Sequence, residues 1–254
     1  MMTTIQNSKV PEIIALYWVI KIAATTLGET GADLFSMTLN IGYDFTIALF
    51  LSLFALSLYF KLKQAQYTPV LYWLTFTTSA IAGTAISDYI DRTLGFGYLL
   101  GSVLLVAILL IILSLWYLKE RSLSVDKITS PRVEIYYWMA FLVANTLGTA
   151  LGDYMADDLT LGFLSSAAVI GGLLVLCAIL HYFTRISGII LFWLAFIMTR
   201  PFGATFGDFL TKNHSQGGVD IGTVGASAFF AIVLVIALWI EFKRWSNKSI
   251  ASAF

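Results

Sequence analysis

Charged residues are scarce in this chain: they make up 12% of its 254 residues, against roughly 25% in a soluble domain. Hydrophobic residues make up 59%, which predicts a single membrane domain over residues 1–254. The one cysteine, Cys177, excludes an internal disulfide and an all-thiolate metal site. A net charge of zero argues against nucleic acid as a partner. Because protease, hydrolase, phosphate-loop and dinucleotide motifs are all missing, we expect neither an enzyme nor a bound cofactor.

Long apolar segments are abundant, and a bilayer-crossing helix needs roughly 20 mostly apolar residues. Eight segments qualify: 13–35, 42–60, 69–90, 97–118, 133–155, 161–183, 188–210 and 221–240. Eleven of the fifteen basic residues fall in the N-terminal tail, the loops after even-numbered segments and the C-terminal segment. This bias predicts a multi-pass protein of a bacterial inner membrane with both termini in the cytoplasm.

The four odd-numbered segments share one motif. Each has a tryptophan near its start, a glycine ten residues later and an aspartate five residues after that. The motif residues are Trp18, Gly28 and Asp33; Trp73, Gly83 and Asp88; Trp138, Gly148 and Asp153; Trp193, Gly203 and Asp208. The tryptophans are 55, 65 and 55 residues apart, as two successive duplications would produce. We therefore expect four parallel two-helix repeats, at about 11–66, 67–130, 131–186 and 187–246.

The tryptophans and glycines have a structural interpretation. Amphipathic indole rings at helix starts are typical anchors at the membrane interface. Each motif glycine is followed four residues later by a second small residue, a pattern that lets membrane helices approach closely. The sequence thus predicts an all-α fold in which the odd helices form an inner bundle and the even helices face lipid.

The aspartates continue polar columns, since residues four apart share one helix face. Lys21, Thr25, Glu29 and Asp33 form one column, and Asn145, Thr149 and Asp153 another. Intramembrane acids typically mark ion pathways or proton relays. We expect the columns to line a cavity that opens to the outside and binds a small cation. The predicted cation-binding residues, of which the five carboxylates are also the candidate metal ligands, are Glu29, Asp33, Asp88, Asp153, Asp208, Thr84, Asn145 and Thr149.

Two basic residues lie inside predicted helices. Arg200 is too deep to reach the interface, and we expect it to act as a counter-charge that pairs with an acid such as Glu29. Lys21 either serves as a second counter-charge or extends to the cytoplasmic interface. The competing structural interpretation treats the aspartates as helix-end anchors paired with Arg92 or Lys212. It is expected to account for one or two of them, and it leaves a non-transporting scaffold or sensor as the alternative function.

Four tandem two-helix repeats with a tryptophan near each start resemble a family of bacterial membrane-anchored proteins known only as a repeat of unknown function. The resemblance covers about Pro11 to Trp245 and implies no established activity. A local likeness is narrower: the segment from Glu29 to Asp33 is similar to the Glu-x-Gly-Asp motif of manganese and calcium transporters, although Ala32 separates its glycine from its aspartate. The expected partners are the lipid bilayer and a small cation, either divalent (manganese, calcium or magnesium) or a coupled proton. An organic cation is the further alternative, because an aromatic content of 15% could supply cation–π contacts. A homo-oligomer is left open.

Overall fold

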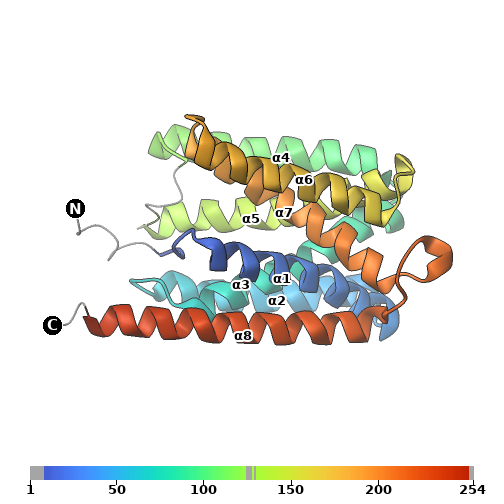
Figure 1. Ribbon diagram of the computed structural model, residues 1–254, viewed down its shortest axis with the longest axis horizontal. Coiled ribbons are helices and arrows are strands. Elements are labelled where there is room, and N and C mark those ends of the chain that lie inside the picture. The colour runs from blue at the N-terminus through green and yellow to red at the C-terminus, as the bar shows by residue number, and fades with distance from the viewer. Residues whose placement is uncertain (1–8, 124–127, 129, 252–254) are drawn as a thin grey trace.

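The computed structural model describes residues 9–123, 128 and 130–251, and within them the regular structure is helical throughout. Eight α-helices follow one another in four pairs (Figure 1). They are α1 (Ala15–Asp33), α2 (Gly42–Lys63), α3 (Pro69–Asp88), α4 (Gly97–Glu120), α5 (Pro131–Asp153), α6 (Phe163–Phe183), α7 (Gly188–Thr211) and α8 (Gly222–Ala251). The last helix is longer than the predicted 221–240, because the charged segment after Ile240 continues the helix.

The connection inside each repeat also recurs. In the first three repeats the helix changes to a π-helical turn directly after the motif aspartate. These turns are η1 (Leu34–Thr38), η2 (Tyr89–Thr93) and η4 (Tyr154–Asp158). The fourth repeat instead has a longer loop with the 3₁₀ turn η5 (His214–Gln216). Each even helix then starts at or beside a glycine with φ between 70° and 78°, a conformation that residues with a Cβ rarely adopt: Gly42, Gly97, Gly162 and Gly222.

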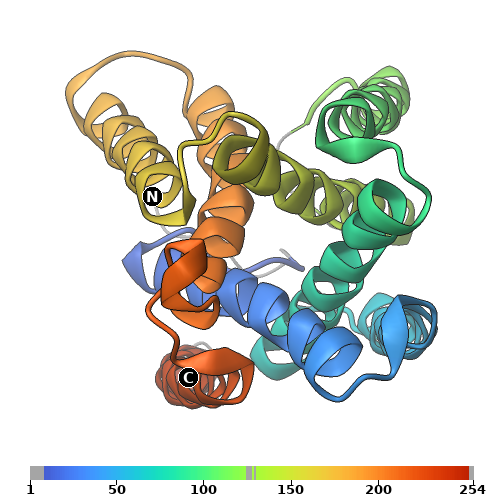
Figure 2. The same cartoon turned by 90° about the vertical axis from the view of Figure 1, so that its right-hand side faces the viewer.

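The odd helices contact one another in a closed ring: α1 packs on α3, α3 on α5, α5 on α7 and α7 on α1 (Figure 2). Each even helix packs mainly on the odd helix of the next repeat, so α2 lies on α3, α4 on α5 and α6 on α7. The last helix, α8, closes the circle by packing on α1. Consecutive repeats are therefore interlocked, and the first and last repeats are joined in the same way as the others.

The chain is a multi-pass membrane protein, with six helices of the described part long and apolar enough to cross a bilayer: α2, α3, α4, α6, α7 and α8. Only 28% of the apolar window is buried in α2, α4, α6 and α8, against 72% in α3 and 50% in α7. Helices α1 and α5 fall outside this group, and each carries three charged residues. Their charges are mostly buried within the protein, as the site below shows.

The prediction that the motif tryptophans anchor at the interface is wrong for two of the four. Trp73 and Trp138 are fully buried. They pack in an aromatic cluster that fills the ring between the odd helices, where Trp73 contacts Tyr17 and Trp138 contacts Tyr72. Trp18 and Trp193 are only partly buried, so the interface prediction stays a prediction for those two.

Candidate functional site

The motif glycines bring the odd helices together around a common axis. Each one faces the next odd helix at the residue three positions before that helix's own glycine. The contact partners are Ala80 for Gly28, Asn145 for Gly83, Arg200 for Gly148 and Thr25 for Gly203. A Cβ on Gly28 would lie 2.7 Å from the Cβ of Ala80, and one on Gly83 would lie 2.9 Å from the Cβ of Asn145. The odd helices therefore approach one another as closely as predicted, and a side chain at these glycines would clash with the neighbouring helix.

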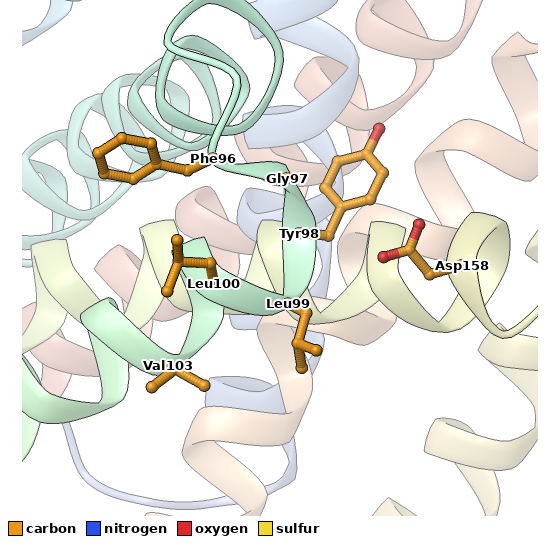
Figure 3. A pocket seen from close by; sticks show the side chains of 7 residues that line it. All are labelled: Phe96, Gly97, Tyr98, Leu99, Leu100, Val103 and Asp158. Atoms are coloured by element: carbon orange, nitrogen blue, oxygen red, sulfur yellow. The ribbon is translucent and has the colours of Figure 1, made fainter.

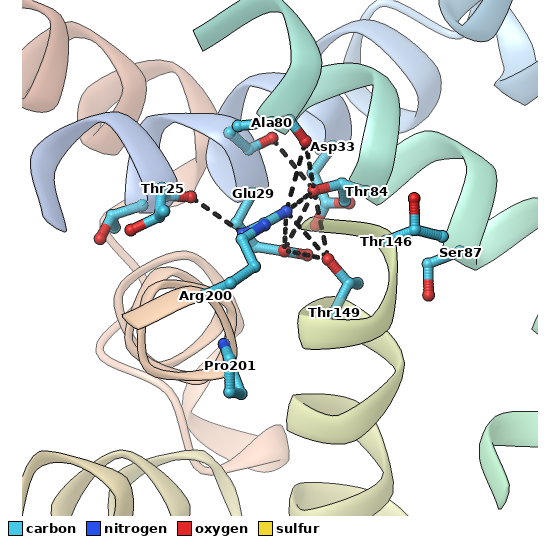
Figure 4. Close-up of polar contacts among 12 residues, drawn as sticks. Thr25, Glu29, Asp33, Ala80, Thr84, Ser87, Thr146, Thr149, Arg200 and Pro201 are labelled. Carbon is cyan, nitrogen blue, oxygen red and sulfur yellow. Dashed lines mark hydrogen bonds and ion pairs between the residues drawn. The ribbon is translucent and has the colours of Figure 1, made fainter. Parts of the chain in front are cut away.

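Arg200 extends from α7 across the ring and reaches all three other odd helices (Figure 4). Its Nη1 donates to the backbone oxygen of Thr25 on α1 at 3.0 Å. Its Nη2 donates to Thr149 Oγ1 on α5 at 2.9 Å and also contacts Thr84 on α3. With 1% of its surface exposed, Arg200 occupies the centre of the ring.

Glu29 is the counter-ion of Arg200. Its Oε2 lies 3.3 Å from Arg200 Nη2, and the residue is 3% exposed. The hydroxyls of Thr84 and Thr149 donate to the same oxygen at 3.3 and 3.4 Å. The predicted pairing of Arg200 with Glu29 is confirmed, and all four odd helices contribute to this polar layer.

Asn145 does not join this group. It is buried at 3% exposure, and its amide donates to Ser79 Oγ on α3 at 3.0 Å. The position of Asn145 in its repeat is the one held by Arg200 in the fourth. The structure therefore makes Asn145 a link between α5 and α3.

The four motif aspartates form the next layer, and two basic residues divide them into pairs. Arg92 Nη2 lies 3.6 Å from Asp88 and 3.1 Å from Asp153. Lys212 Nζ lies 3.0 Å from Asp33 and 3.2 Å from Asp208. The anchoring interpretation was expected to pair one or two aspartates with a base, whereas the structure places Arg92 or Lys212 within 3.6 Å of all four.

Burial and charge act against each other at Lys212, which follows the end of α7. Burial lowers the pKa of its ammonium group, but the carboxylates of Asp208 and Asp33 outweigh this and raise the pKa above its ordinary value. The side chain of Lys212 is therefore cationic at neutral pH.

Lys21 does not extend to the interface, so that interpretation is wrong. It is 1% exposed, and its Nζ donates to the backbone oxygen of Phe196 at 2.6 Å and to the Thr199 hydroxyl. The ammonium group also lies 3.6 Å from the centre of the Phe196 ring. No acidic partner of Lys21 occurs in the described part of the chain, so it balances charge only at a distance.

The expected open cavity is absent around these groups. Glu29 and the four aspartates are each 1–3% exposed, so their side chains are packed against protein and do not line a water-filled vestibule. Among residues 9–123, 128 and 130–251, three or more acidic, histidine or cysteine side chains nowhere converge as a metal site would require. A pocket opens instead at the start of α4, and Tyr98 and Asp158 are among the residues that line it, whereas none of the five carboxylates is (Figure 3).

The sequence analysis named Arg92 and Lys212 only as partners of the aspartates in the competing interpretation and did not place them among the site residues. Both lie nineteen residues after the tryptophan of their repeat. This position is basic in the second and fourth repeats, whereas Met37 and Asp157 occupy it in the first and third. The 120-residue offset between Arg92 and Lys212 is the signal that could have assigned both to the site as equivalent residues of the internal duplication.

Comparison with known proteins gives a family and no activity. No curated protein and no solved structure matches the chain. A family profile matches it four times, at residues 16–67, 71–122, 136–187 and 191–244, and each match spans an odd helix and the even helix that follows. The chain therefore belongs to the family described as Repeat of Unknown Function (DUF347).

Proposed function

We propose that this protein transports a small cation through the centre of a bundle formed by α1, α3, α5 and α7. In this proposal all eight helices cross a bacterial inner membrane, both termini are cytoplasmic, and the even helices face lipid. Two facts support it. The even helices that can span a bilayer bury only 28% of their apolar windows, and α1 and α5 belong to the same ring of contacts as α3 and α7.

The observation that carries the proposal is an excess of buried acid on the ring axis. Five carboxylates, from Glu29, Asp33, Asp88, Asp153 and Asp208, are matched by three directly paired bases, and the fourth base of the ring, Lys21, has no direct acidic partner among the described residues. Ionisable residues inside a membrane domain are costly and are retained mostly where ions or protons move. An acidic surplus favours a cation over an anion.

The proton is the cation that this arrangement supports best. Carboxylates and hydroxyls also suit magnesium, calcium or manganese, but a divalent ion would need the acids to regroup, because the described residues hold no three-acid cluster. A proton needs only a series of titratable groups. Deeper in the ring Lys21 and the hydrogen-bonded pair Tyr72–Tyr137, whose hydroxyl oxygens are 2.5 Å apart, extend the series towards the termini.

A non-transporting scaffold or sensor is the second candidate, and one observation favours it. Every motif aspartate has a basic partner. A purely structural role, in which these ion pairs hold the ends of the helices together, would therefore be sufficient for this layer. The deeper Arg200–Glu29 layer is not explained by that role, since it lies a full helical turn below the aspartates.

Flux measurements on purified protein in liposomes separate the two candidates. Proton, sodium, potassium, magnesium, calcium and manganese fluxes are measured with ion-specific dyes and compared with protein-free liposomes. The proposal predicts flux for one of these cations above the protein-free rate, with protons first. If all six rates equal the protein-free rates in both directions of the gradient, the transport proposal is wrong and the scaffold is supported.

A further inference from the structure

The basic residues of the aspartate layer follow the internal duplication. Arg92 and Lys212 occupy the same position in the second and fourth repeats. Each lies four residues after the aspartate of its own helix and also reaches the aspartate of the next odd helix around the ring. Arg92 joins α3 to α5 and Lys212 joins α7 to α1, so the layer has twofold character inside a fourfold ring.

The two kinds of partner differ in accessibility. The carboxylate side chains are 1–4% exposed, whereas the Arg92 and Lys212 side chains are 31% and 19% exposed. Each base is attached at the rim, on η2 or on the loop after α7. The acids are fixed on rigid helices, and the bases approach them from outside.

The bases satisfy these acids only in part. Both carboxylate oxygens of Asp88, a residue that is 1% exposed, lack a hydrogen-bond partner within the described residues, and so does Oδ1 of Asp208. The 3.6 Å separation of Asp88 from Arg92 is a charge contact without a hydrogen bond. Buried carboxylate oxygens normally accept hydrogen bonds, so the Asp88 site has unused capacity for a cation that donates them.

We propose that the aspartates form two equivalent cation sites, Asp88 with Asp153 and Asp33 with Asp208, each closed by a tethered cation, Arg92 or Lys212. The ligands that fit are small cations with N–H donors, guanidinium-like at the first site and ammonium-like at the second. If the protein transports a cation, displacement of these side chains opens the outer end of the pathway. Only this last role rests on the proposed function.

Chemical rescue tests the sites directly. Arg92→Ala and Lys212→Ala each remove one tethered cation, and both are expected to lower the thermal unfolding midpoint in detergent. Millimolar guanidinium should restore about half or more of the loss in Arg92→Ala, and ethylammonium should do so in Lys212→Ala. The matched controls Arg185→Ala and Lys119→Ala, at exposed positions near the other ends of the helices, should show no rescue. Absence of rescue in both site variants overturns the proposal.

A second measurement uses the unaltered protein, in case the variants do not fold. Acetylation of Lys212 is followed by mass spectrometry, with exposed Lys63 as the internal reference. Ethylammonium should displace Lys212 from its carboxylates and raise its labelling rate relative to Lys63. An unchanged ratio at every concentration contradicts the proposal. Rescue or displacement without cation flux would support the two cation sites and contradict transport. Cation flux without rescue or displacement would support transport and contradict the two sites.

Discussion

Replacement of Arg200 by methionine tests whether the Arg200–Glu29 pair holds the centre of the ring together. Arg200→Met removes the guanidinium that contacts α1, α3 and α5 and leaves Glu29 buried at 3% exposure without its base. Loss of one partner of a buried pair costs roughly 3–5 kcal/mol. Arg200 also donates to four groups on α1, α3 and α5, and hydrogen bonds between membrane helices contribute about 0.6–2 kcal/mol each. The lost hydrogen bonds and the unpaired carboxylate therefore both contribute to this cost.

The double variant Glu29→Gln/Arg200→Met separates these contributions. It removes both charges, so the unpaired-carboxylate cost disappears and the variant should regain about 2 kcal/mol or more over Arg200→Met. Equilibrium unfolding in mixed SDS micelles measures both values, and the seven tryptophans provide the fluorescence signal. Equal stability of the single and double variants would refute a buried, mutually dependent pair.

Further predictions concern packing and the opposite end of the ring. Gly83→Ala places a Cβ 2.9 Å from Asn145 Cβ and 3.0 Å from a backbone nitrogen, so it should cost about 1–3 kcal/mol by overpacking. In the control Gly172→Ala, no atom lies within 4 Å of the new Cβ, so the change should stabilise α6 by up to about 1 kcal/mol. The same SDS titration measures both variants, and equal changes in unfolding free energy would contradict the packing argument. Glu134 accepts from Lys9 and Lys61 at 2.9 Å, all three nearly buried. Glu134→Gln should therefore lower the thermal midpoint far more than the exposed control Asp44→Asn, and a small effect would show that these lysines find other partners.

Much of the architecture could be predicted from the sequence because the repeat is regular. Helix type and approximate bounds follow from apolar length, and the close approach of the odd helices follows from the glycines. The pairing of Arg200 with Glu29 was also predictable, since a mid-helix arginine in a membrane domain needs an acid.

Other features depend on how the repeats close around the ring. Trp73 and Trp138 have the amphipathic ring and the helix-start position that are typical of interface anchors, yet packing between the odd helices buries them. Lys21 has a stem long enough to reach the interface, yet its ammonium binds a backbone oxygen and an aromatic face on α7. The π-helical turns after Asp33, Asp88 and Asp153 have no local sequence signal that we recognise. These contacts join residues from different repeats, and periodicity within one helix does not specify them.

Proton uptake into liposomes under a potassium-diffusion potential tests the central claim most directly. The wild type is compared with Glu29→Gln, which keeps the size of the axial side chain and removes its charge, and with Asp44→Asn, an exposed acid at the start of α2. The account predicts wild-type uptake above the protein-free rate, a loss of about tenfold or more in Glu29→Gln, and no change in Asp44→Asn. Equal uptake by the wild type and Glu29→Gln would contradict a pathway through the axial carboxylates.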